Sequence, residues 1–167
     1  MKFKNNGFTL IELIVVFGIL GILAATTLVA LNPFAQFQKA NDARRKTDLS
    51  QIQKALESFY QDYQMYPSST NGANPYLMTY TDKSGSTVTV NWGNSWQPYM
   101  NTVPKDPASG KYYIYYSPST DRQTYYLYAS LERGTAADDC KGASPCHTNA
   151  CGSANCNFGV SSPNVTP

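Results

Sequence analysis

Residues 7–12 read Gly7-Phe8-Thr9-Leu10-Ile11-Glu12, and they open an apolar stretch that carries no further charge until Lys39. From Phe8 to Leu31 there are 24 residues, interrupted only by Glu12 and three threonines. A helix that crosses a bilayer needs about 20 mainly apolar residues. Residues 8–32 are therefore predicted to form a helix long enough to span a membrane.

Glu12 is the one carboxylate inside this apolar stretch. An acid at such depth costs about 2.5–3.5 kcal/mol on insertion scales, so it predicts a functional group with a partner. Phe8 lies four positions earlier, on the same face of a helix. If the chain were cut after Gly7, the new amino terminus of Phe8 could neutralise Glu12 within one chain or between neighbouring chains.

Two simpler explanations of this terminus fit less well. A secretory signal would use Lys2 and Lys4 as its basic region and the Ala24-Ala25-Thr26 segment as a weak cleavage site, but its apolar core spans only about 7–15 residues. A plain membrane anchor would have the observed length, but it leaves Glu12 without a role. Both remain alternatives.

These residues resemble the type IV pilin and type II secretion pseudopilin superfamily. The similarity lies in the basic leader 1–7, the following Phe8–Leu13 segment and the apolar helix after it. The resemblance implies cleavage after Gly7 by a prepilin peptidase, N-methylation of Phe8, and recruitment of the subunit into a helical filament through Glu12 and Phe8.

The same resemblance implies a set of partners. The subunit would be held in the membrane before assembly and would then polymerise with copies of itself. An inner-membrane assembly platform, an ATPase, and minor pilins or pseudopilins would take part. The formal net charge is +2 and the basic residues neither cluster on a domain face nor form a long run, so no nucleic acid partner is predicted for the isolated subunit.

Pro33 predicts a break in the long helix. Proline has no amide hydrogen and its ring clashes with the carbonyl of Val29, so the helix should kink or unwind over residues 29–32. Many superfamily members place this proline four residues earlier, where Val29 stands. After the break, residues 33–66 are expected to form an amphipathic helix, ending near Met65, on the stripe Leu49, Ile52, Leu56, Phe59, Tyr60 and Tyr63.

The polar residues of this second helix are expected to face water. Asp48 lies opposite the apolar stripe, and Arg44-Arg45-Lys46 is the only basic cluster in the chain. A solvated helix face just outside the membrane is the role that we assign to this cluster. Basic residues on both sides of the span leave its orientation ambiguous by the positive-inside rule.

Residues 67–139 are predicted to form a globular head with an antiparallel sheet. Strand patterns occupy residues 87–92, 112–116 and 125–131, and the last two are separated by turn residues typical of a hairpin. Tyrosines in these strands should cover the sheet on one face, and the other face could serve a partner. The head would pack on the amphipathic helix in an α+β fold.

Two short segments resemble major pseudopilins in particular. Tyr66-Pro67 ends an Asp-x-x-x-Tyr-Pro segment, and residues 103–110 resemble the Leu-Pro-x-Asp-Pro-Trp-Gly loop, with Ala108 at the tryptophan position. Major pseudopilins also carry calcium in their carboxyl-terminal loops. Asp138 and Asp139 are the candidate calcium ligands here, and no other cofactor is expected.

The tail 140–167 carries all four cysteines. An even number of cysteines in a loop-rich segment predicts disulfides, which require an oxidising compartment and place the carboxyl terminus outside the cytoplasm. Three pairings are open. Zinc is the alternative, with His147 as a further ligand. The residues concerned are Cys140, Cys146, Cys151 and Cys156.

The function expected from these features is structural. The chain has one histidine and none of the common catalytic motifs, so an enzyme is not expected. We expect a pilin-like filament subunit, the major pseudopilin of a type II secretion-like system. It would pass once through the inner membrane and assemble into a periplasmic or surface filament. The alternatives are a type IV pilus subunit for adhesion, DNA uptake or motility, and a membrane-anchored binding protein.

Overall fold

The computed structural model describes residues 7–70, 77–117, 120–134 and 151–164 of the 167-residue chain. The chain divides into two compact units, one ending at Phe37 and the other beginning at Gln38. Among the described residues, one helical stretch, which starts at Leu10, is long and apolar enough to cross a membrane. The two units are described in turn.

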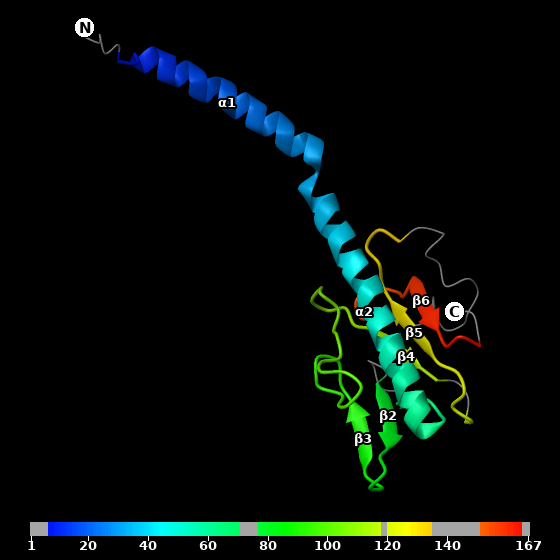
Figure 1. The fold of residues 1–167 in the computed structure, drawn as a ribbon. Coiled ribbons are helices and arrows are strands. Elements are labelled where there is room, and N and C mark those ends of the chain that lie inside the picture. Colours follow the sequence, from blue (N-terminus) through cyan, green and yellow to red (C-terminus); the bar gives the residue numbers. More distant parts are fainter. Residues whose placement is uncertain (1–6, 71–76, 118–119, 135–150, 165–167) are drawn as a thin grey trace. The chain divides into compact units, whose positions relative to one another are not determined.

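The first unit consists mainly of α1 (Leu10–Leu31), which Figure 1 shows in blue. The helix ends at Asn32, whose backbone is left-handed at φ 40° and ψ 70°. The next helix, α2 (Pro33–Tyr63), begins directly afterwards, because proline suits the first position of a helix. Asn32 caps this new helix, since its carbonyl accepts hydrogen bonds from the amides of Ala35 and Gln36 at 3.1 and 3.4 Å. The interruption therefore involves a single residue.

Most of helix α2 lies in the second unit. Its buried apolar side chains recur at spacings of three and four, as the amphipathic pattern predicts, and they include Leu49, Ile52, Leu56 and Phe59. The helix ends at Tyr63, two residues before the expected end. The reason is Gln64, which turns left-handed at φ 56° while its amide still bonds the carbonyl of Tyr60.

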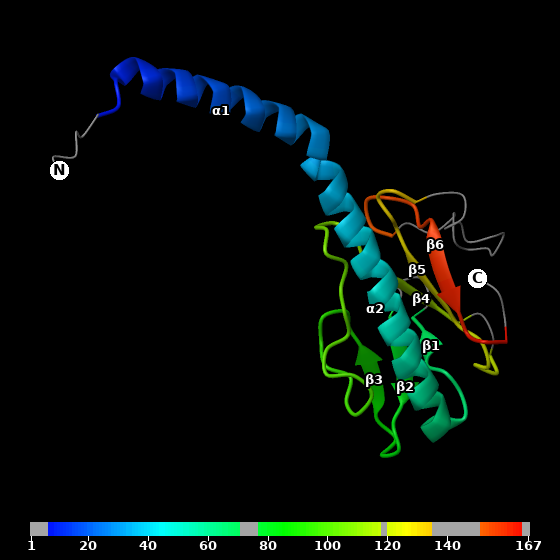
Figure 2. The same ribbon diagram turned by 45° about the horizontal axis from the view of Figure 1, so that its top comes forward.

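Two antiparallel sheets of three strands accompany α2 in the second unit, as Figures 1 and 2 show. The first sheet has the order β1-β2-β3 and the second has the order β4-β5-β6. The strands are β1 (Ser68–Ser69), β2 (Met78–Thr81), β3 (Thr87–Val90), β4 (Ile114–Tyr116), β5 (Tyr126–Ala129) and β6 (Phe158–Ser161).

The α+β fold predicted from the sequence is confirmed. The expected hairpin is β4–β5, with Tyr115 opposite Leu127, and the threonine–valine alternation forms β3. Sequence patterns missed three strands. β1 has two residues, β2 follows residues 71–76, which lie outside the description, and β6 lies in a tail rich in glycine, serine and asparagine.

The core between α2 and the sheets is rich in tyrosine. Tyr113, Tyr115 and Tyr125 are fully buried, and each hydroxyl donates a hydrogen bond. Tyr113 donates to Asp48 at 2.8 Å and Tyr115 donates to the carbonyl of Pro67 at 2.6 Å. Tyr125 donates to Glu57 at 3.1 Å. Large aromatic rings thus fill the core while their polar ends remain satisfied.

Arg45 does not lie on a solvated helix face, and the sequence interpretation of this residue was wrong. Its side chain is 0% exposed and contacts three carboxylates. The guanidinium donates to Asp106 at 2.8 and 3.0 Å, to Asp42 at 2.8 Å and to Glu132 at 3.0 Å. Arginine suits this position because its planar fork can serve several carboxylates at once. The basic residue that sequence patterning assigns to water therefore joins α2 to two loops of the head.

The loops that meet Arg45 are themselves held by the same acids. Asp106 accepts a hydrogen bond from the amide of Ala108 at 2.8 Å, which fixes the loop that resembles the pseudopilin motif. Asp42 accepts from the amides of Glu132 and Arg133, each at 2.8 Å. Burial alone would lower the pKa of Arg45, but these carboxylates outweigh it and raise the pKa above its ordinary value.

Asp48 is a second charged residue that the sequence interpretation wrongly placed in water. It is 7% exposed and accepts a hydrogen bond from the hydroxyl of Tyr113. Burial raises the pKa of the Asp48 carboxyl above its ordinary value, although the Tyr113 hydrogen bond and the charge of Arg44 oppose the shift. The ionised form is therefore less favourable in the folded chain than in the unfolded chain.

We expect Arg45→Ala to lower the free energy of unfolding by about 3–5 kcal/mol, because the change leaves buried carboxylates without their cation. Arg44→Ala is the matched control, and it should change the free energy by less than about 1 kcal/mol because Arg44 is exposed. Urea unfolding of the full-length protein in detergent micelles, followed by tryptophan fluorescence, measures both. Equal effects of the two substitutions would contradict the stabilising role of the buried Arg45 ion pairs.

The raised pKa of Asp48 predicts a pH-dependent stability. As the pH rises above about 4, the unfolded chain releases the Asp48 proton first, so this group lowers stability progressively. Asp48→Asn keeps an acceptor for Tyr113 and removes the ionisation. The unfolding free energy of Asp48→Asn minus that of the parent should therefore increase from pH 3.5 to pH 7. A difference for Asp48→Asn that stays constant with pH would refute the prediction.

Candidate functional site

The candidate site lies at the amino-terminal end of α1, where Phe8 and Glu12 flank the helix start. Thr9 is the N-cap residue, with extended backbone angles of φ −79° and ψ 152°. The Glu12 carboxylate accepts from the Thr9 amide at 2.9 Å and from the Thr9 hydroxyl at 2.7 Å. The Glu12 amide donates back to the Thr9 hydroxyl at 3.3 Å. These bonds form a capping box, which satisfies donors that a helix start leaves open.

Glu12 thus has neutral hydrogen-bond donors in the uncut chain. The Phe8 nitrogen is an amide here and carries no charge, so the charge pair expected from the sequence belongs to a cleaved chain. Sequence reasoning missed the role of Thr9. The signal was available, because a threonine followed three residues later by glutamate is the capping-box pattern.

The surface around Glu12 is apolar. Phe8, Ile11, Val15 and Val16 line a shallow groove of about 290 Å³ beside the carboxylate. Phe8 is 85% exposed and Ile11 is 65% exposed. The large apolar side chains of α1 described by the structure, from Leu10 to Leu28, are all exposed in the single chain. Such a helix is stable only in an apolar environment such as lipid or a bundle of similar helices.

The remaining residues predicted from the sequence fall in different places. Gly7 is exposed, and a side chain at its Cα would meet no atom within 4 Å. Cys151 and Cys156 form a disulfide and are buried beside Ile114 and Tyr128. Cys140, Cys146, His147, Asp138 and Asp139 lie outside the described residues. The calcium and zinc alternatives therefore stay predictions, and no group of three metal-ligating side chains occurs in the described part of the chain.

An exposed apolar helix with a capped glutamate, followed by a second helix on a small α+β head, defines a pilin-like subunit. The prokaryotic N-terminal methylation motif matches residues 2–28, and the family model of type II secretion system protein G matches residues 32–144. The chain belongs to the type II secretion system protein G family. It is accordingly a structural subunit of the major pseudopilin class, which confirms the resemblance seen in the sequence.

Individual relatives agree with this assignment. Type II secretion system core protein G of Pseudomonas aeruginosa strain PAO1 is 35% identical over 138 residues, which cover 81% of this chain and 92% of the relative. The protein of the same name from Vibrio cholerae O1 is 34% identical over 115 residues, or 69% and 73% of the two chains. The type IV major pilin PilA of Myxococcus xanthus is 39% identical over 69 residues, which cover 41% and 30%. No solved structure matches the chain.

Proposed function

We propose that this pseudopilin is cleaved after Gly7 and then assembles through α1 into a helical homopolymer, in which Glu12 pairs with the ammonium group of Phe8 of a neighbouring copy. The observation that carries the proposal is the capped Glu12 on a helix whose described large apolar side chains are all exposed. Cleavage would remove Lys2 and Lys4 and create an amine one residue before the N-cap.

The capping box explains how Glu12 is held before cleavage. Two neutral donors from Thr9 hold the carboxylate, but they leave its negative charge uncompensated. An ammonium group makes a charge-assisted bond about twice as strong as a neutral one. In apolar surroundings this difference increases, because the low dielectric strengthens the attraction between charges. The pair would therefore set the axial register of one subunit against the next.

Before assembly, α1 would lie in the inner membrane. Its 22 residues give about 33 Å at the helical rise of about 1.5 Å per residue, which suits a hydrocarbon core of about 30 Å. The head would lie outside the cytoplasm, where the Cys151–Cys156 disulfide is stable. In the filament the apolar helices would bundle together and leave both lipid and water.

The partners follow from the family. A prepilin peptidase would cut after Gly7 and the amino group of Phe8 would be methylated, while an assembly platform, an ATPase and minor pseudopilins would act on the mature subunit. The match to protein G over residues 32–144 supports a secretion pseudopilus. The similarity to a type IV pilin covers 41% of the chain, so the pilus alternative has the narrower support.

Mass spectrometry of the protein isolated from the cell envelope should give a mature chain that begins at N-methylated Phe8. The reason is that Gly7 and Phe8 lie within the N-terminal methylation motif matched over residues 2–28, and that Gly7 is exposed. Gly7→Val should accumulate the uncut form, because the side chain obstructs cleavage at this bond. A mature chain that begins at Met1 or near Thr26 would refute the maturation step.

Glu12→Gln should abolish filament assembly while cleavage continues, because glutamine keeps an oxygen acceptor for Thr9 and loses the charge. Thr9→Val is the matched control. It removes the hydroxyl of the capping box, which weakens the helix start by about 0.5–2 kcal/mol, yet it keeps the charge and should still assemble. Electron microscopy of sheared filaments and the mature mass measure the two steps separately. Normal filaments from Glu12→Gln would overturn the proposed pairing.

A further inference from the structure

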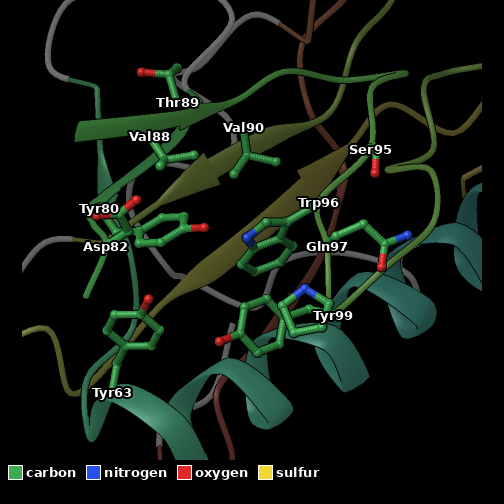
Figure 3. Close-up of a pocket in the computed structure, with 11 residues that line it drawn as sticks. Tyr63, Tyr80, Asp82, Val88, Thr89, Val90, Ser95, Trp96, Gln97 and Tyr99 are labelled. Atoms are coloured by element: carbon green, nitrogen blue, oxygen red, sulfur yellow. The ribbon is translucent and has the colours of Figure 1, made fainter. Parts of the chain in front are cut away.

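The second unit contains a cavity of about 460 Å³ in which no residue of the assembly site takes part. It lies between the end of α2, the strands β2 and β3, and the loop that holds Trp96, Gln97 and Tyr99, as Figure 3 shows. Cavities of about 300–1,000 Å³ are typical of small-ligand sites in proteins. Its prominent lining residues are Tyr63, Tyr80, Asp82, Trp96 and Tyr99.

The lining rings are held in place by Phe59 from α2. Phe59 stacks on Tyr63 with ring centroids 4.3 Å apart and planes at 3°. Its edge contacts place Tyr80 at 4.8 Å and Tyr99 at 5.2 Å. Because Phe59 is almost fully buried, the rings are fixed before any ligand arrives. A site formed in advance loses little entropy on binding.

Three tyrosines line the cavity. In Figure 3 the hydroxyl of Tyr80 is directed toward the indole of Trp96, and the rings of Tyr63 and Tyr99 lie on the side of the helix. The Tyr99 hydroxyl donates a hydrogen bond to Asp62 at 2.8 Å, so the lone pairs of its oxygen remain acceptors. Burial, together with the hydrogen bond to Asp62, raises the pKa of Tyr99. The phenol is neutral at physiological pH and presents an acceptor next to a carboxylate.

Asp82 adds a negative charge to the lining. Its Oδ1 accepts from the Ser84 hydroxyl at 2.6 Å and from the amides of Ser84 and Ser86, each at 2.9 Å. The hydrogen bond from the Ser84 side chain is the largest of the interactions that lower the pKa of Asp82, so the carboxylate is ionised at neutral pH. All three bonds use Oδ1, and their donors are neutral, so they leave the negative charge of the carboxylate uncompensated.

A cation of the chain itself lies over one of the lining rings. The Lys83 ammonium is 5.6 Å from the ring centroid of Tyr63. Phe59 covers one face of that ring, so the ammonium lies over the other. A cation within about 6 Å of an aromatic centroid is attracted by the negative face of the ring. Lys83 therefore shows which kind of group these rings attract.

We propose that this cavity binds an ammonium group on an aliphatic chain, the group that a lysine side chain carries. An ammonium has three N–H donors, for which the lining offers tyrosine oxygens as acceptors, and its charge matches Asp82. The methylene groups would lie against Val88, Val90 and the aromatic rings. Lys83 is a resident competitor for one of these rings.

The edge of β3 indicates an extended peptide as the source of the lysine. β3 is the outer strand of its sheet, and no strand in the described part of the chain pairs with its other side. The Asp82 amide bonds the Ser86 carbonyl at 2.9 Å, and because paired and unpaired positions alternate, Thr87 and Thr89 direct their backbone groups outward. A partner segment in extended conformation can add to such an edge.

Calorimetric titration of the full-length protein in detergent micelles tests the ammonium site. N-acetyl-lysine methylamide should bind, and the norleucine analogue, which lacks the ammonium, should not. Asp82→Asn keeps the oxygen that Ser84 and Ser86 contact and removes the charge, so it should weaken binding by about fivefold or more. Asp121→Asn, its control in another turn, should leave the affinity unchanged.

Lys83→Met should tighten binding by about two- to fivefold, the size of an exposed cation–π contact, whereas Lys54→Met on the exposed face of α2 should not. Equal binding of the lysine and norleucine probes, or no binding to either the parent or Lys83→Met, would overturn the proposal. A capped Thr-Val-Lys-Val-Thr peptide should bind about tenfold tighter than the single-residue probe if the β3 edge takes part. Equal affinity would refute the peptide source and indicate a free amine.

Discussion

The contact between Arg45 and its three carboxylates is the constraint on which the arrangement of the head depends. A buried guanidinium is expensive to desolvate, and that cost is offset only when all its partners are present with good geometry. The partners come from α2 itself, from a loop 61 residues later and from a loop 87 residues later. Each loop must therefore reach the same face of α2, which places the two sheets against the helix. The loop at residues 103–110, which resembles the pseudopilin motif, has a structural role here. Asp106 in this loop accepts two of the four hydrogen bonds that the structure describes from Arg45.

The tyrosine-rich core works by a related principle. The sequence has 13 tyrosines and only 14% charged residues, and several of the charged side chains are buried in the head. Asp48 and Glu57 on α2 accept hydroxyl protons from Tyr113 and Tyr125 on the chain that forms the second sheet. A leucine core would bury a similar apolar area without fixing how the helix lies along the strands. Hydroxyls that need a partner at one distance favour a single register of α2 against the sheet.

The sequence predicted the elements that local patterns determine. The apolar run, the spacing of the α2 stripe and the turn residues between β4 and β5 each follow from period and turn chemistry. The buried Arg45 does not, because hydropathy assigns a charged residue to water and the compensating acids are distant in sequence. β6 is equally hidden, since Phe158–Ser161 has weak strand propensity and is held by pairing with β5. At the candidate site, Glu12 was recognisable by its apolar surroundings, and the missed Thr9 could have been found from the capping-box spacing. The clustering of Tyr63, Tyr80 and Tyr99 needed the structure, because these residues are distant in sequence.

Glu12 and Arg45 represent two outcomes of the same physical demand. A charge in apolar surroundings needs both hydrogen bonds and an opposite charge. Arg45 obtains both within one chain, so its ion pairs and hydrogen bonds stabilise the fold without a partner molecule. Glu12 obtains hydrogen bonds from Thr9 but no opposite charge from any described residue of its own chain. The unmet part of the demand can be satisfied by a new amino terminus, and the exposed apolar surface of α1 can be buried by lipid or by similar helices. The head thus folds with internal ion pairs, whereas Glu12 has only neutral partners among the described residues.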